Sequence, residues 1–189
     1  MKPSYEGLKG KHVLIIGDVG MGKTVMSRRL LAEATNIEEE IMILDFAPPA
    51  SVHGDRRVGG FLIETCISGV THCKSHDINT PRLSAKTPQE LVHLADANRL
   101  ITERMLKTFI ENPSRVLFIN DVSIHLQMGE LHDLLYAVNH AETAILNGYM
   151  GSFLRDDRGT GVSMRENSLM KKLAGRMDKV FSLTENGGK

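Results

Sequence analysis

Runs of consecutive apolar residues recur along the chain, and each run ends at a glycine or a polar residue or is followed by one. They predict strands at residues 12–17, 41–45, 115–120, 143–147 and 179–183. Because the runs are continuous rather than alternating, they indicate strands that are buried on both faces, as the strands of a parallel sheet are.

Helical spacing of apolar residues occupies most of the gaps between these strands. It predicts helices at about 24–34, 88–111, 129–140 and 163–175. Thr87 and Glu90 are spaced as a capping box at the start of the second helix, and Ser163 and Glu166 have the same spacing at the start of the fourth.

Strands that alternate with helices predict right-handed crossovers and a parallel sheet. We therefore expect an α/β fold with three layers, in which helices cover both faces of the sheet, and a single domain over residues 1–189. Residues 51–86 are rich in Gly, His, Arg and Thr and are expected to be mostly loop. Long ordered loops in a compact domain are often functional.

The composition excludes several classes of partner. The chain has 189 residues, its 23 basic side chains equal its 23 acidic ones, and aromatic residues make up 5%. This balance gives no strong signal for nucleic acid or an anionic membrane. No apolar run approaches the ~20 residues of a membrane span, no secretory leader is visible, and two cysteines fit a reducing compartment. We expect a cytoplasmic protein with no membrane partner.

The loop between the first predicted strand and the first helix carries the pattern G-x-x-x-x-G-K-[ST]. The matching residues are Gly17, Asp18, Val19, Gly20, Met21, Gly22, Lys23 and Thr24. Glycines let backbone N–H groups point at a polyphosphate, and the N-terminus of the following helix adds a positive field. Lys23 would reach the β- and γ-phosphates, and the Thr24 hydroxyl would bind Mg²⁺.

With a strand before it and a helix after it, this loop resembles the phosphate-binding loop of the P-loop NTPase superfamily. The resemblance implies a RecA-like architecture, with ATP and Mg²⁺ as the ligands of residues 17–24. No Asn-Lys-x-Asp or Thr-Lys-x-Asp sequence that would recognise guanine occurs in the chain, so ATP is preferred over GTP.

Polar residues end three of the predicted strands, where a carboxylate is needed to hold Mg²⁺ directly or through water. Asp45 and Asp121 are the two candidate metal ligands. Asn120 stands before Asp121, so either Asp121 binds the metal or it activates the attacking water. Asn147 ends the fourth strand and is a candidate contact to the γ-phosphate or to that water.

Residues 120–131 and 143–148 also resemble the P-loop-type corrinoid adenosyltransferases. That family has an Asp-Glu pair, an apolar and small-residue stretch, and then a glycine and a leucine that open the next helix. Here Asn120-Asp121 replaces the Asp-Glu pair, and residues 19–21 replace a lysine-containing form of the phosphate loop. The pattern therefore indicates shared architecture more than shared chemistry.

Arginines occur in two Gly- and Asp-rich segments. Arg158 lies between Arg155 and Arg165 in a predicted loop that could close over the nucleotide and bring a positive charge to the phosphates. Residues 54–60 could bind an anionic substrate in the same way.

Two hypotheses about function follow. The first is an enzyme that binds Mg-ATP and hydrolyses it or transfers a group to a small substrate, with Lys23, Asp121, Asn147 and Arg158 as the catalytic candidates. The second is a nucleotide-dependent switch that binds a protein partner, and it is favoured by the lack of a Glu after Asp121. The sequence leaves the acceptor and the formation of a homo-oligomer open.

Overall fold

The structure, a computed structural model, describes residues 3–54 and 56–184. The strands are β1 (His12–Gly17), β2 (Ile41–Asp45), β3 (Ser51–His53), β4 (Arg56–Val58), β5 (Val70–Lys74), β6 (Val116–Asn120), β7 (Thr143–Tyr149) and β8 (Lys179–Leu183). The helices are α1 (Lys23–Ala34), α2 (Pro81–Ser84), α3 (Pro88–Glu111), α4 (Val122–Leu126), α5 (Leu131–Val138) and α6 (Val162–Ala174), and a 3-10 turn spans Glu6–Leu8.

Six strands form one sheet in the order β5-β2-β6-β7-β1-β8, and every neighbouring pair is parallel. All their carboxyl ends therefore lie at the same edge of the sheet. The register places Asp45 of β2 opposite Asn120 of β6. This edge brings together the polar residues with which the strands end.

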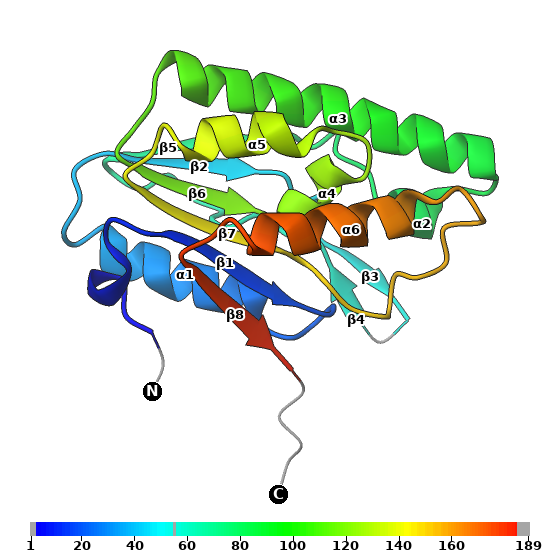
Figure 1. The fold of residues 1–189 in the computed structure, drawn as a ribbon, viewed down its shortest axis with the longest axis horizontal. Coiled ribbons are helices and arrows are strands. Elements are labelled where there is room, and N and C mark those ends of the chain that lie inside the picture. The colour runs from blue at the N-terminus through cyan, green and yellow to red at the C-terminus, as the bar shows by residue number, and fades with distance from the viewer. Residues whose placement is uncertain (1–2, 55, 185–189) are drawn as a thin grey trace, which may run out of the picture.

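The helices form a layer on each face of the sheet (Figure 1). Helix α1 packs on one face, against β1, β6 and β7. Helices α3, α4, α5 and α6 contact one another on the opposite face, with α3 against β2 and α4 against β7. The α/β class, the parallel sheet and the helices on both faces are as the sequence predicts.

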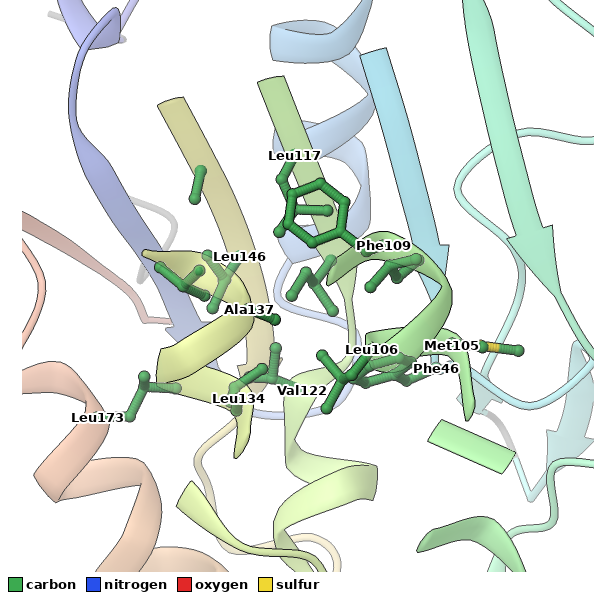
Figure 2. Close-up of a cluster of buried hydrophobic side chains, with 14 of the residues drawn as sticks. Phe46, Met105, Leu106, Phe109, Leu117, Val122, Leu134, Ala137, Leu146 and Leu173 are labelled. Atoms are coloured by element: carbon green, nitrogen blue, oxygen red, sulfur yellow. The ribbon is translucent and has the colours of Figure 1, made fainter. Parts of the chain in front are cut away.

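The strands contribute alternate residues to two hydrophobic cores. Val13 and Ile15 of β1 pack on the α1 side, and Leu14 between them packs on the other side. On that second side Phe109 of α3 lies near Leu117 of β6 in the close-up of the core (Figure 2). Burial on both faces explains why the inner strands β1, β2, β6 and β7 have continuous apolar runs.

The expectation that residues 51–86 are mostly loop was wrong in part. Strand β5 pairs with β2 at one edge of the sheet, and β3 pairs with β4 as a separate antiparallel hairpin. The sequence of β5, Val-Thr-His-Cys-Lys, has a single strongly apolar residue, and its side chains are half-buried or exposed. An edge strand of this kind lacks the apolar run that identified the others.

The helix starts differ in one respect from the prediction. Thr87 caps α3 as expected, because its side chain accepts a hydrogen bond from the Glu90 N–H at 3.1 Å. The prediction of a second capping box was wrong. The N-cap of α6 is Gly161, with a φ of 81°. The side chains of Ser163 and Glu166 accept hydrogen bonds from Arg82 instead of capping the helix.

The predicted helix at 129–140 is shorter and has a neighbour that the pattern missed. It forms α5, and the single turn of α4 comes directly after β6.

The longest helix, α3, has 24 residues and buries one side of its length. No helix in the described ranges is long and apolar enough to cross a membrane.

Candidate active site

The predicted phosphate loop connects the end of β1 to the start of α1. Gly22 is the N-cap of α1 with a φ of 85°, a left-handed conformation that glycine adopts without strain. A Cβ at Gly17 would lie 2.7 Å from the Leu183 carbonyl oxygen of β8, so this position has no room for a side chain. The first N–H groups of α1 have no acceptor within the helix and face its N-terminal end.

A cavity of about 100 Å³ lies where this loop meets the ends of β6 and β7. Of the residues predicted from the sequence, Val19, Gly20, Lys23, Thr24, Asp121 and Asn147 line it. Arg57 and Gly60, from the segment 54–60 that the sequence suggested as an anion site, also line it. The structure thus brings the phosphate loop, the candidate carboxylate and an arginine to one place.

Lys23 is held by the backbone of its own loop. Its Nζ donates hydrogen bonds to the carbonyl oxygens of Gly17 at 2.9 Å and Asp18 at 2.7 Å. Burial lowers the pKa of the Lys23 ammonium, and the carboxylates of Asp121 and Asp18 oppose that shift. The ammonium is therefore placed among loop carbonyls, in a partly dehydrated position beside a carboxylate.

Asp18 ties the phosphate loop to the segment that follows β7. Its carboxylate accepts hydrogen bonds from the N–H groups of Val19 at 2.7 Å, Ser152 at 2.7 Å and Phe153 at 3.2 Å. Burial raises the pKa of Asp18, but these hydrogen bonds outweigh it and hold the pKa below its usual value. The side chain at this position thus fixes two loops side by side.

Asp121 follows β6 directly and has a left-handed backbone, with a φ of 61°. Its N–H donates to the Asn147 side-chain oxygen at 3.1 Å, and its carboxylate accepts a hydrogen bond from the Ser123 hydroxyl. The Ser123 oxygen in turn accepts from the Tyr149 N–H at 3.1 Å. Strand β7 therefore sets the position of the Asp121 carboxylate.

Asn147 and Asn120 form a buried amide network beneath this cavity. The Asn147 Nδ2 group donates to the Asn120 Oδ1 atom at 2.9 Å and to the Ser27 hydroxyl at 3.0 Å. Asn120 donates to Asp45 at 2.7 Å. Ser27 was not singled out in the sequence, because a serine inside a helix gives no signal of its partner on another strand.

Asp45 lies at the far end of the network and is fully buried. Its carboxylate accepts hydrogen bonds from the Leu62 N–H, from Asn120 and, at 3.1 Å, from His72. Asp45 does not line the cavity of about 100 Å³ that Asp121 lines. The structure thus separates the two candidate carboxylates, and the metal role of Asp45 stays a prediction without this geometric support.

Arg158 and its neighbours are placed outside this cavity. Arg158 is exposed and has a φ of 55°. Arg165 donates to the Gly129 carbonyl oxygen and to Glu130, both at 2.8 Å. A catalytic role for Arg158 stays a prediction, and it requires the loop to move.

A second buried polar cluster adjoins the site, and the sequence predictions, which named Arg82 only as a residue that could line a cleft, did not pair its members. Arg82 of α2 donates to both carboxylate oxygens of Glu166 in α6, at 2.9 and 2.8 Å. Gln127 also donates to Glu166, at 3.0 Å. Burial raises the pKa of Glu166 to about 7, against the lowering effect of Arg82. Only the fold brings these three elements together.

Two of the residues that line the cavity carry groups that could serve as ligands of a Mg²⁺ ion. Thr24 and Asp121 supply a hydroxyl and a carboxylate, and Mg²⁺ commonly takes one or two protein ligands and completes its octahedron with phosphate oxygens and water. In the described ranges, no three or more His, Cys, Asp or Glu side chains are grouped so that they could hold a metal by themselves.

The sequence matches no protein-family model, and no curated protein matches it either. The resemblances to the P-loop NTPase superfamily and to the corrinoid adenosyltransferases therefore stay predictions.

Proposed function

We propose that this protein binds Mg-ATP at residues 17–24 and hydrolyses it or transfers a group from it to a small substrate. The observation that carries the proposal is the convergence of Lys23, Thr24 and Asp121 on one cavity, with the start of α1 beside them. A helix N-terminus, an ammonium group and glycine backbone together favour a polyphosphate.

Each residue has a role that follows from its place. Lys23 would exchange its bonds to the loop carbonyls for the β- and γ-phosphates. Thr24 and Asp121 would hold Mg²⁺, which neutralises charge on the phosphates when it is bound. Asn147 would keep the Asp121 backbone in position through its 3.1 Å hydrogen bond. Arg57, which lines the same cavity, adds a cation on the side of the hairpin.

The order of the strands supports a RecA-like member of the P-loop superfamily. Strand β7 lies between β1, which leads into the phosphate loop, and β6, which leads to Asp121. Open parallel sheets bind ligands at their carboxyl edge. The phosphate loop, Asp121 and Asn147 all lie at that edge.

The nucleoside would fit a second cavity beside the loop. This cavity has a volume of about 410 Å³ and is lined by Asp18, Met21, Arg56, Phe153 and Leu183 among others. The Arg56 guanidinium carbon lies 4.8 Å from the centre of the Phe153 ring. An aromatic ring and a guanidinium are surfaces on which a nucleobase stacks well.

A nucleotide-dependent switch is the second candidate. Asp121 is the only carboxylate among the described residues that line the cavity of about 100 Å³ beside Lys23 and Thr24, and the residue after it, Val122, is buried. A site without a second carboxylate to activate water favours slow turnover. Hydrolysis that is slow alone and is stimulated only by a protein would support the switch, whereas stimulation by one small molecule would support the enzyme.

The Lys23→Ala variant tests the binding of ATP. The loss of a charged hydrogen-bonding group costs about 1.5–3 kcal/mol, so we expect the Kd for Mg-ATP in isothermal titration calorimetry to rise by roughly 10- to 100-fold. Circular dichroism would show that the variant is folded. Lys171→Ala, at an exposed position on α6, is the matched control. An unchanged Kd for Mg-ATP in folded Lys23→Ala protein would contradict the proposed function.

A further inference from the structure

A further cavity, of about 280 Å³, lies between the start of α1 and the segment that follows β4, and we call it the hairpin cavity. It adjoins the cavity of about 100 Å³ that Asp121 lines, because the two share Gly20, Lys23, Thr24, Arg57, Gly59 and Gly60. It shares no lining residue with the cavity of about 410 Å³ in which the nucleoside would fit. A nucleotide that occupied those other two cavities would therefore leave the hairpin cavity free for a second ligand.

The charged residues that line the hairpin cavity are all basic. They are Lys23, Arg28 and Arg57, and no Asp or Glu of the described chain is among the lining residues. The neighbouring cavities differ in this respect, since Asp121 lines one of them and Asp18 lines the other. A cleft lined by charges of one sign concentrates ions of the opposite sign. The hairpin cavity therefore favours an anion.

The three basic side chains keep hydrogen-bond donors for such an anion. The Lys23 ammonium has three N–H groups and donates to two loop carbonyls. The Arg28 guanidinium has five, and in the described chain it donates from Nε to the Leu62 carbonyl oxygen at 2.9 Å and from Nη2 to that of Phe61 at 2.6 Å. Arg57 is exposed, so its guanidinium is free to turn toward a ligand.

The wall that carries Arg57 is held in place by the protein itself. Besides the bonds from Arg28, the Gly60 N–H donates to the Pro48 carbonyl oxygen at 2.8 Å. A Cβ at Gly59 would lie 2.6 Å from the same oxygen, so the chain packs too closely there for a side chain. Because this wall is already ordered, a ligand does not have to order it on binding, which favours affinity.

The size and charge of the cavity favour a small dianion. Its volume is slightly below the roughly 300–1,000 Å³ of sites that enclose drug-sized ligands. Because the Coulomb energy grows with the charge of the ligand, several nearby cations favour a dianion over a monoanion. Arginine pairs well with phosphate oxygens. Val25 is 69% exposed and Arg57 is exposed, so the cavity opens to solvent and a phosphate in it keeps part of its hydration.

We propose that the hairpin cavity binds the phosphate group of a small phosphomonoester, as a second substrate beside ATP. The role of second substrate rests on the proposed function, because it requires ATP in the adjoining cavity. The binding of the phosphate group depends on the three basic side chains and requires no nucleotide. The proposal gives the anion that the sequence predicts for residues 54–60 a place and a chemical class.

An NMR titration with three small probes tests the class of ligand. ¹⁵N-labelled protein would first be saturated with Mg²⁺ and a non-hydrolysable ATP analogue, so that the phosphate loop is filled. Methyl phosphate, acetate and methylammonium would then be added at about pH 8, where the phosphate monoester is a dianion. We expect saturable shifts of the Val25 and Gly59 amide resonances with methyl phosphate, at least tenfold weaker binding of acetate, and no saturation with methylammonium.

Two results of this titration would overturn the proposal. If the ATP analogue abolishes the binding of methyl phosphate, the ion occupies the position of the nucleotide's own phosphates. If acetate binds as tightly as methyl phosphate, the cavity does not select a dianion.

Substitutions at position 25 assign the effect to this cavity, because Val25 lines the hairpin cavity and not the one that Asp121 lines. Val25→Glu adds a negative charge, and Val25→Gln is the control of equal length without the charge. We expect Val25→Glu to weaken the binding of methyl phosphate at least tenfold and Val25→Gln to change it less than threefold. Equal affinity in both variants and the wild type would contradict the proposal.

Arg57→Gln removes a basic group from the cavity. We expect it to weaken the binding of methyl phosphate at least tenfold, whereas Arg176→Gln, at another exposed arginine, should leave it unchanged. Both side chains are exposed, so both variants are expected to fold, which circular dichroism would check. Unchanged binding in Arg57→Gln would overturn the proposal.

Calorimetric titrations of the same proteins with Mg-ATP separate this proposal from the proposed function. ATP binding without any binding of methyl phosphate would overturn the phosphate site and leave the proposed function intact. If the protein does not bind ATP, but nucleotide-free protein binds methyl phosphate and responds to Val25→Glu and Arg57→Gln, the phosphate site stays and the nucleotide beside it is removed.

Discussion

Asp45 and Asp121 show how much a residue's surroundings decide its role. Both follow an apolar run that forms a strand of the central sheet, and both lie at the same edge of that sheet. Asp45 is enclosed by three donors from the protein, whereas Asp121 lines the cavity beside Lys23 and Thr24. The sequence cannot separate them, because the donors to Asp45 come from segments distant in the chain.

Paired substitutions at these two positions test the difference. In Asp45→Asn, an NH₂ group would face another donor, Leu62 N–H or Asn120 Nδ2, so we expect the free energy of unfolding in urea to fall by about 1–3 kcal/mol. In Asp121→Asn, the left-handed backbone is tolerated, so the stability should change little. There we expect ATP turnover to fall at least tenfold while the Kd for ATP changes less than threefold. Full turnover in Asp121→Asn, with turnover lost in a stable Asp45→Asn protein, would reverse the assignment.

At the scale of elements, the sequence predicts those strands and loops that are determined by residues next to one another in the chain. The five apolar runs became β1, β2, β6, β7 and β8 within about two residues. Four of these strands, β1, β2, β6 and β7, lie inside the sheet, where a strand covered on both sides is apolar on both faces. The fifth, β8, is an edge strand whose residues are half-buried or exposed, and a short apolar run still identified it. The connection of β1 to α1 by residues 17–24 was equally visible, since all its residues are contiguous, whereas phosphate binding there stays a prediction. Strand β5, at the opposite edge, was missed because its sequence has a single strongly apolar residue, and hydrogen bonds to β2 hold it in the sheet without an apolar run.

The parts of the site that the sequence does not show are contacts between elements. Asn147 meets Asn120 only because β7 pairs with β6, and Ser27 reaches Asn147 from α1. The ion pair between Arg82 and Glu166 joins α2 to α6. Glu166 also fitted a capping box, and that local interpretation was wrong because Gly161 already begins the helix.

The loop before α6 is expected to close when Mg-ATP binds. Asp157 accepts hydrogen bonds from the N–H groups of Gly159 at 3.1 Å and Ser163 at 2.9 Å, so the loop is ordered by its own side chains and anchored to the helix. We expect Mg-ATP to increase hydrogen-exchange protection over residues 155–163, as the loop closes and brings Arg158 to the phosphates. Turnover should fall about tenfold in Arg158→Ala and stay unchanged in the exposed control Arg176→Ala. Equal exchange with and without Mg-ATP, together with normal turnover of Arg158→Ala, would rule out a lid.

At the scale of the whole molecule, the buried pair of Arg82 and Glu166 makes stability depend on pH. The pKa of Glu166 rises from 4.5 to about 7 on folding, chiefly through burial. The folded protein therefore binds this proton more readily than the unfolded chain does. The resulting contribution to stability is fully present below pH 4.5 and is lost as pH rises through about 7.

Unfolding in urea between pH 4.5 and pH 8 measures this effect. We expect the free energy of unfolding of the wild type, relative to Glu166→Gln, to fall by up to about 3 kcal/mol over that range. Glu166→Gln carries a neutral side chain at every pH, so its own stability should lack this dependence on pH. The control is Glu142→Gln, which breaks an exposed pair with Arg115 and should leave the pH profile unchanged. A constant difference between wild type and Glu166→Gln at every pH would contradict the shift.

The pairing of β1 has a consequence for how the chain is made. Residue 12 of this strand pairs with residue 144 of β7, and residue 13 pairs with residue 179 of β8. During synthesis β1 therefore waits without a partner on either edge until most of the described chain has left the ribosome. Contacts between residues so distant in sequence form slowly. Until they form, β1 exposes unpaired backbone N–H and C=O groups along both edges and apolar side chains on both faces, and exposed segments of this kind are prone to aggregate with other chains.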